Sequence, residues 1–260
     1  MDLGLAGKTA VVTGGSKGIG LAVVRTLIAE GVRVVTGSRG ITPELKETAA
    51  VPVTVDLSTP EGATELIERA TIELGGIDIL VNNVGIGDMG DFALGGFLDL
   101  PEAAWTHNFD LHFYSALRVS RAALPGLVER KGALVNISSI GARVPGDGPI
   151  AYNVSKSALT ALGKVLAAEF GPQGVRVNTV SPGPVSTGVW TDPAGFSGVV
   201  ADSLGIPHDA FVAGALERMA PDTGRLTTPE EVARTVAFLL SPNNLSGADV
   251  LLDGGILKQV

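Results

Sequence analysis

Three side chains near the middle of the chain have the types and spacing needed to move a proton to or from an oxygen bonded to carbon. Tyr152 and Lys156 lie four residues apart, and Ser139 precedes the tyrosine by thirteen residues. Residues four apart on a helix share one face, and a nearby ammonium group lowers the pKa of a phenol from about 10. A general acid or base works best with a pKa near the working pH. Taken alone, a tyrosine and a lysine at this spacing are more often an ordinary helix-surface pair, so the catalytic interpretation needs other motifs.

A second signal, for a bound phosphate group, lies near the N-terminus. The apolar run 8–13 predicts a short buried strand, and 18–30 predicts a helix. Between them, residues 14–20 have the spacing Gly-x-x-x-Gly-x-Gly rather than the common Gly-x-Gly-x-x-Gly. A glycine-rich turn lets the backbone approach a pyrophosphate, and a helix N-terminus supplies free N–H groups and partial positive charge. Glycine-rich segments alone often mark only tight turns, but a strand before and a helix after favour a dinucleotide site.

Six segments of the chain resemble the motifs of the short-chain dehydrogenase/reductase family, in the family's order. They are residues 13–20, 82–85 (with Val84 where the family usually has alanine), 136–139, the Tyr152/Lys156 pair, 181–187 and 253–255. The resemblance covers nearly the whole chain. It implies that Ser139 hydrogen-bonds the substrate oxygen, that Tyr152 transfers the proton, and that Lys156 lowers the Tyr152 pKa and binds the nicotinamide ribose. The neighbouring Ser138 is expected to cap the strand end.

The same resemblance assigns a set of residues to the cofactor. Asp56 corresponds to the family residue near the adenine ring, and Thr187 to the one near the carboxamide and phosphates. The full set is Gly14, Ser16, Lys17, Gly18, Ile19, Gly20, Ser38, Arg39, Asp56, Leu57, Asn83, Gly85, Tyr152, Lys156, Pro182, Gly183, Val185 and Thr187.

The charges near the second predicted strand indicate which nicotinamide cofactor is used. NAD-binding members generally end this strand with an acidic residue that accepts hydrogen bonds from the ribose. Here Ser38 and Arg39 follow the strand without an acid, and Lys17 adds a second cation in the glycine-rich segment. A guanidinium suits a phosphate through charge-assisted hydrogen bonds. The sequence therefore predicts NADP(H) as the cofactor. The alternative is that Lys17 and Arg39 are only solvated basic residues with no role in cofactor binding.

One residue of the family pattern is missing. The family usually carries a catalytic asparagine seven residues after a tryptophan, where it holds a water in a proton relay to the lysine. Counting from Trp105 gives His112, whose imidazole can also hold a water and titrates near neutral pH. The alternative, that His112 is a core substitution with no role in a proton relay, has equal weight. His107 and His208 are expected at the surface, and no spacing in the chain suggests a metal site.

Composition narrows the class of protein. With 260 residues, 45% of them hydrophobic, the chain can fill one large core and is not disordered. It has no cysteine, which excludes disulfides and a cysteine nucleophile, and its net charge of −8 argues against nucleic acid as a partner. We see neither a signal-peptide pattern nor an apolar stretch that would span a bilayer, so we expect a cytoplasmic protein without a membrane partner.

Strand and helix patterns alternate along the chain. The strand candidates are continuous apolar runs, typical of strands covered on both faces; they are 8–13, 32–37, 51–56, 77–82, 132–138, 174–180 and 248–252. The helix candidates are 18–30, 60–74, 102–124, 150–170 and 229–240. This order predicts an α/β fold with a Rossmann-type, doubly wound parallel sheet of about seven strands and helices on both faces. We expect one dinucleotide-binding oxidoreductase domain over residues 1–260.

The substrate is less well specified by the sequence. Residues 188–226 form a long segment that contains Trp190 and Phe196 and is expected to be a lid. Its apolar side chains suit either an apolar or aromatic carbonyl compound or the packing of another subunit. Residues 87–96 are a candidate for the opposite lip. The segment 251–257 is either covered by a partner or forms an edge strand, and the family resemblance implies a homo-oligomer, either a tetramer or a dimer.

Together these observations predict an NADP(H)-dependent oxidoreductase that interconverts a small carbonyl compound and its alcohol. Two alternatives remain. The same three side chains could act on a carbon–carbon double bond or in an epimerisation, or the chain could be a nucleotide-sensing protein on a reductase-like fold. The intact set of Ser139, Tyr152 and Lys156 argues against the sensor, while the missing asparagine is the one point in its favour.

Overall fold

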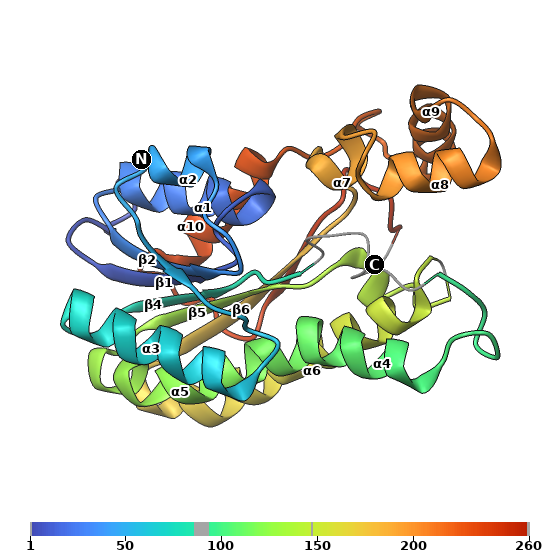
Figure 1. Cartoon of the computed structure of the whole chain (residues 1–260). Helices are drawn as coiled ribbons and strands as arrows, with labels where there is room; N and C mark the ends of the chain where they lie inside the picture. The colour runs from blue at the N-terminus through green and yellow to red at the C-terminus, as the bar shows by residue number, and fades with distance from the viewer. Residues whose placement is uncertain (1, 86–93, 147, 259–260) are drawn as a thin grey trace.

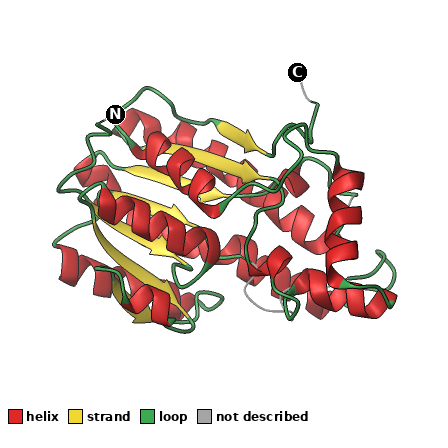
Figure 2. Cartoon of the chain, turned by 90° about the horizontal axis from the view of Figure 1, so that it is seen from above, coloured by secondary structure: helices red, strands yellow, loops and turns green. Residues whose placement is uncertain are grey.

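The sheet that positions the candidate site is parallel throughout. A computed structural model describes residues 2–85, 94–146 and 148–258, and in these residues seven strands pair in the order β3-β2-β1-β4-β5-β6-β7 (Figure 1, Figure 2). The strands are β1 (Thr9–Thr13), β2 (Arg33–Ser38), β3 (Val51–Thr54), β4 (Ile79–Asn82), β5 (Ala133–Ile137), β6 (Arg176–Pro182) and β7 (Asp249–Leu252). The predicted doubly wound Rossmann-type sheet is confirmed.

Helices cover both faces of this sheet, as Figure 1 shows. On one face lie α1 (Gly18–Ala29), α2 (Pro43–Lys46) and α10 (Pro229–Leu240); on the other lie α3 (Pro60–Leu74), α5 (Ser115–Arg130) and α6 (Ile150–Phe170). Strand β1 shows why its sequence is a continuous apolar run. Val12 packs in the cluster with α1 and α10, and its neighbour Val11 packs in the cluster with α3 and α5. Each fully buried side chain of this kind contributes about 1.5–3 kcal/mol.

The predicted helix 102–124 differs from the structure in two ways. It is divided into α4 (Glu102–Phe109) and α5 by a π-helical turn, Asp110–Tyr114, which contains His112. It also continues through Pro125 to Arg130, because Leu124 and Leu127 remain buried against the sheet. The predicted end at 124 was therefore wrong. A π-helical turn inserts one residue into the helical repeat, and such turns are frequent at functional sites.

The long segment 188–226 is built mainly from three helices beyond the carboxyl ends of the strands. These are α7 (Gly188–Thr191), α8 (Phe196–Leu204) and α9 (His208–Met219), which lie together in Figure 1. The predicted lip at 87–96 falls largely on 86–93, outside the described residues. At the C-terminal side, β7 forms the edge of the sheet and pairs only with β6 in the described part of the chain.

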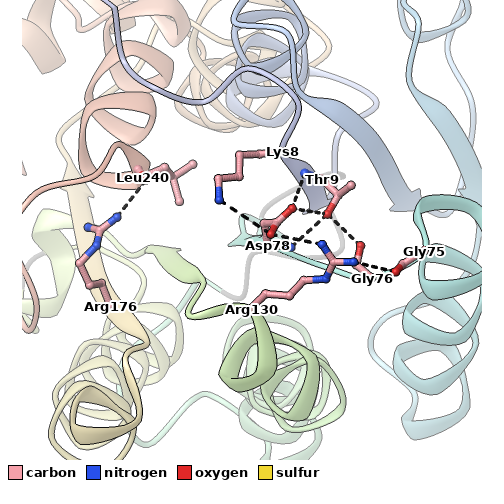
Figure 3. Close-up of polar contacts among 8 residues, drawn as sticks. All are labelled: Lys8, Thr9, Gly75, Gly76, Asp78, Arg130, Arg176 and Leu240. Atoms are coloured by element: carbon pink, nitrogen blue, oxygen red, sulfur yellow. Dashed lines mark hydrogen bonds and ion pairs between the residues drawn. The ribbon is translucent and has the colours of Figure 1, made fainter.

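The amino end of the sheet is held by a buried carboxylate (Figure 3). Asp78 Oδ2 accepts hydrogen bonds from Thr9 N at 2.9 Å and Thr9 Oγ1 at 2.8 Å. Arg130 Nη1 lies 3.5 Å from Asp78 Oδ1, and Lys8 Nζ lies 4.0 Å from it. Burial raises the pKa of Asp78, but the two hydrogen bonds and the two cations outweigh it, so the pKa falls below its usual value. Arg176, the first residue of β6, donates from Nη2 to Leu240 O at 2.9 Å and so caps the C-terminus of α10.

We expect Asp78→Ala to lower the free energy of unfolding by about 2–3 kcal/mol, because two hydrogen bonds to a charged group are lost. The pKa of Asp78 is lower in the folded protein, so its contribution is complete above the ordinary value of 3.8 and disappears as the pH falls through the folded pKa. Urea unfolding at neutral and acidic pH measures both effects. Asp202→Ala, at an exposed carboxylate, is the control; equal midpoints for the two variants would contradict the assignment.

Candidate active site

One cleft gathers the predicted site residues at the carboxyl ends of the strands. Its volume is about 950 Å³, within the usual range for a small-molecule site. Of the predicted residues, it is lined by Gly14, Ser16, Lys17, Gly18, Ile19, Gly20, Ser38, Arg39, Asp56, Leu57, Asn83, Gly85, Ser139, Tyr152, Lys156, Pro182, Gly183, Val185 and Thr187. His112 is the one predicted site residue outside this lining.

The glycine-rich segment forms the turn between β1 and α1. Gly18 has φ +56°, a conformation that other residues rarely adopt, and a Cβ on Gly20 would lie 2.1 Å from Gly14 O. Asn83 Nδ2 donates to Thr13 O at 3.0 Å and Gly14 O at 3.2 Å, so the end of β4 fixes the turn. The first turn of α1 then lines the cleft with backbone N–H groups that have no partner within the helix. This arrangement can hold a phosphate group.

The end of the cleft near β2 and β3 carries both cations of the predicted cofactor site. Arg39 and Lys17 line it with exposed side chains. Asp56 also lines it, and its Oδ1 accepts from Ser58 Oγ at 2.7 Å and Ser58 N at 3.0 Å. The Ser58 side chain, followed by the Ser58 backbone and the charges of Arg39 and His107, holds the pKa of Asp56 below its usual value against the opposing effect of burial.

The three candidate catalytic side chains converge at the other end. Tyr152 and Lys156 lie on α6, and Ser139 follows β5 and caps a short 3-10 turn, Ile140–Ala142, by accepting from Gly141 N at 3.1 Å. Lys156 Nζ is buried, donates to Ile137 O at 2.8 Å and lies 5.8 Å from the centre of the Tyr152 ring. Ser138 lies next to Ser139, and its Oγ donates to Lys156 O at 3.1 Å. It therefore joins β5 to α6, so the prediction that it caps the strand end is wrong.

The pKa values of this pair differ from the expectation. Burial raises the pKa of Tyr152, and a hydrogen bond with the Ser139 side chain opposes that rise. Burial also lowers the pKa of Lys156 to about 7. The prediction that Lys156 lowers the Tyr152 pKa is therefore wrong, because burial raises that pKa instead. The physical reason is that a lysine with a pKa near 7 carries only a partial charge at neutral pH, while the phenol is itself desolvated.

His112 packs against the ring of Tyr152. It is fully buried in the π-helical turn, and its ring meets that of Tyr152 edge-on, with centroids 4.9 Å apart and planes at 90°. Asn108 is also buried, but its Nδ2 donates to Ala104 O at 2.9 Å, within its own helix. The position reached by counting from Trp105 is therefore in contact with the predicted catalytic tyrosine.

The other two histidines have different surroundings. His107 is exposed, as predicted. His208 is half-buried, because its Nε2 lies 2.8 Å from Oγ of the fully buried Ser197, which itself donates to Trp190 O at 3.1 Å. The prediction of a surface residue was wrong for His208. No cluster of three or more histidine, cysteine, aspartate or glutamate residues within the described ranges could hold a metal ion.

Several residues of the cleft were not predicted as site residues. Val189, Trp190, Asp192 and Phe196 reach it from the segment 188–226, of which the sequence identified only the aromatic members as candidates. Ile41 and Thr42 line the end near Arg39, and Thr42 Oγ1 donates to Ser16 O at 2.7 Å. Thr42 is also the N-cap of α2, just before Pro43. A threonine followed by proline is a helix-start signal that could have revealed α2 and this contact.

Known proteins resemble this chain over its whole length. A family model for enoyl-(acyl carrier protein) reductase matches residues 14–257. L-xylulose reductase of Mus musculus is 34% identical over 269 residues, which cover 99% of each protein. The crystal structure of L-sorbose reductase from Gluconobacter frateurii, complexed with NADPH and L-sorbose, covers 100% of both chains with a TM-score of 0.90 at 32% identity.

A third relative is also a short-chain oxidoreductase. The NADPH-bound short-chain oxidoreductase of Pseudomonas aeruginosa PAO1, whose catalytic centre is atypical, covers 97% of this chain and 98% of its own with a TM-score of 0.83 and 29% identity. The sheet order, the cleft and these similarities all indicate the same protein family. The chain is a member of the short-chain dehydrogenase/reductase family, and thus an oxidoreductase that acts on a small molecule.

Proposed function

We propose that this oxidoreductase uses NADP(H) to interconvert a carbonyl group and an alcohol. The observation that carries the proposal is the convergence of Ser139, Tyr152 and Lys156 with the glycine-rich turn in one cleft. A nicotinamide cofactor is typical of the family, and it supplies or accepts the hydride when bound. NADPH in the solved structures of two relatives supports the choice of the phosphorylated form.

The residues of the cleft fit a dinucleotide. A side chain at Gly20 would collide with the backbone of Gly14, so glycine is needed for α1 to pack this closely against the turn that lines the cleft. Arg39 and Lys17 offer positive charge where a 2′-phosphate would bind. Lys156, at the opposite end, has ammonium protons beyond the one that it donates to Ile137 O, and these can bind a ribose hydroxyl group.

We assign the proton chemistry to the same three side chains. In the reducing direction, the Ser139 hydroxyl donates to the substrate oxygen and stabilises the charge that develops on it as the carbon accepts hydride. The Tyr152 hydroxyl then gives its proton to that oxygen. Its raised pKa keeps the phenol protonated at neutral pH, which suits a proton donor. Lys156 stabilises the resulting tyrosinate when it is charged.

We further propose that residues 1–260 act as one domain in which 188–226 is the substrate lid. Val189, Trp190 and Phe196 give the lid an apolar lining, which supports an apolar or aromatic group beside the carbonyl. Asp192 adds a carboxylate to the same wall, which would suit a hydroxyl group. The L-sorbose and L-xylulose reductases make a polyhydroxy ketone the natural comparison substrate.

A second candidate reaction is reduction of a carbon–carbon double bond, which the description of the matching family model favours. Oxidation of NADPH should be followed with aromatic ketones, aldehydes, quinones, L-sorbose and an unsaturated acyl thioester. We expect turnover with at least one carbonyl compound. Turnover with the thioester alone would establish the second candidate in its place, and inactivity with the whole panel would refute the proposed function.

We also propose a homo-oligomer, either a tetramer or a dimer, and a cytoplasmic location. Exposed apolar side chains on two helices support an assembly: Val154 and Val165 on α6, and Phe238 on α10. In the parts of the chain that the structure describes, no helix is both long and apolar enough to cross a membrane.

His112 should matter more for rate than for stability if it takes the place of the relay asparagine. We expect His112→Asn to retain most of the kcat, because an amide can also hold a water. His112→Leu should lower the kcat by about tenfold or more, because it fills the space without a polar atom. Steady-state rates and urea unfolding of both variants test this. Equal rates across the pH range would mean that His112 only packs against Tyr152.

A further inference from the structure

Arg118 joins two parts of the active site that no sequence motif connects. From α5, its Nη1 donates to Ser58 O at 2.5 Å, and its Nη2 donates to Asp110 Oδ1 at 3.0 Å. Its guanidinium carbon also lies 5.1 Å from the centre of the Tyr114 ring. We propose that Arg118 is a positioning residue that couples the loop 56–58 to the π-helical turn, and so fixes His112 against Tyr152. This inference rests on the proposed function.

The loop 56–58 is the cofactor side of this link. Asp56 and Leu57 both line the cleft. Ser58 orients the Asp56 carboxylate through its backbone N–H and its hydroxyl group. The carbonyl that Arg118 holds therefore belongs to the residue that sets the position of Asp56. A nucleotide that moves or orders this loop would act directly on the guanidinium.

The π-helical turn is the catalytic side. Asp110 is its first residue and Tyr114 its last, so Arg118 contacts the turn at both ends. His112 lies at its centre, edge-on to Tyr152. π-helical geometry is rare and usually limited to single turns, so contacts from outside the turn are needed to keep its register. A movement of Arg118 would change the placement of His112 on the tyrosine ring.

The chemistry of arginine explains why one side chain can do this. The guanidinium is planar and presents its donors in a fixed fork, so two partners are held at a set distance from each other. The side chains of Arg118 and Asp110 are only 23% and 33% exposed, which limits screening of their ion pair by solvent. Arg121 offers a matched comparison on the same helix. It is exposed, and its side chain has no hydrogen bond or ion pair with any other described residue.

The coupling can be measured without turnover, because the chain has only three histidines. Their NMR signals, assigned from His→Gln variants, are followed while adenosine 2′,5′-bisphosphate or AMP is added. These nucleotides carry only the adenosine half of the cofactor. His107 interacts electrostatically with Asp56, which lines the cleft, so the His107 signal should report binding in every variant. The His112 signal should shift in the parent protein and in Arg121→Ala, but not in Arg118→Ala.

Kinetics provide a second readout. Arg118→Ala should lower the kcat by about ten- to hundredfold and leave the KM for the carbonyl substrate nearly unchanged, because only the catalytic geometry is disturbed. Arg118→Lys should restore part of the rate, since a lysine can hold one of the two partners. A folded Arg118→Ala variant that matches Arg121→Ala in kcat would overturn the proposal.

The possible failures are distinguishable. A His112 shift in Arg118→Ala as large as that in the parent protein would overturn the link and leave the proposed function intact. Absence of any His107 response to both nucleotides would overturn the cofactor site, and the link with it. If Arg118→Ala does not fold, the NMR measurement on Arg118→Lys decides, with a reduced His112 shift expected and an unchanged one contradicting the proposal.

Discussion

Tyr152→Phe should lower turnover by about a hundred- to ten-thousandfold, the usual contribution of a positioned general acid. The substitution removes one hydroxyl group and keeps the ring, so the edge-on contact with His112 and the packing on α6 remain. NADPH should bind with nearly the parent affinity, because the glycine-rich turn, to which we assign its phosphates, is unchanged. The loss therefore belongs to the chemical step.

Two measurements test this prediction. Steady-state rates give the kcat of the parent and the variant, and a fluorescence titration gives their affinity for NADPH. Retained turnover above a few per cent of the parent value would remove Tyr152 from the acid role.

The direction of the pH dependence provides a further check. Burial raises the pKa of Tyr152, so the phenol stays protonated above its ordinary range and reduction is sustained, whereas alcohol oxidation needs the tyrosinate and should rise with pH.

The second large effect is on the choice between NADPH and NADH. A charge-assisted hydrogen bond contributes roughly 1.5–3 kcal/mol, and about 1.4 kcal/mol corresponds to a tenfold ratio. Arg39 at the mouth of the cleft should therefore give a ten- to hundredfold preference for NADPH. Arg39→Ala should remove most of it by weakening NADPH alone. Arg39→Asp should reverse it, because the carboxylate repels the phosphate and accepts from the ribose hydroxyl groups.

The ratio of kcat/KM for the two cofactors, in the parent and each variant, is the decisive quantity. Arg69→Ala serves as the control, since Arg69 is an exposed arginine on α3 outside the cleft. A parent protein that uses NADH and NADPH equally well would contradict the role assigned to Arg39. So would a ratio that Arg39→Ala leaves unchanged.

Much of the architecture could be predicted from the sequence because its signals are local. Buried parallel strands have to be apolar on both faces, so the run that became β1 was recognisable from its composition alone. Once the strands are ordered, their carboxyl ends share one edge of the sheet. That is why Ser139, Asn83 and Gly183, far apart in the sequence, could be expected in one cleft.

What the sequence could not predict depends on packing between distant segments. The π-helical turn leaves no local mark, since the sequence predicts one unbroken helix over 102–124 that runs through His112. The pKa of Tyr152 depends on how deeply the cleft buries it, which residue spacing does not state. The link from Arg118 to Ser58 joins residues sixty positions apart and follows no motif.

The buried carboxylate at the amino end of the sheet has a consequence for how this protein can diverge. Asp78 and its partners secure the strands at one end, and the cleft lies at the other. A strand of five residues, such as β1, separates the two by about 16 Å. Substitutions at so great a distance usually add independently. We therefore expect substitutions at cleft residues such as Trp190 and Phe196 to leave the contribution of Asp78 to folding stability unchanged, so the two ends of the sheet can diverge independently.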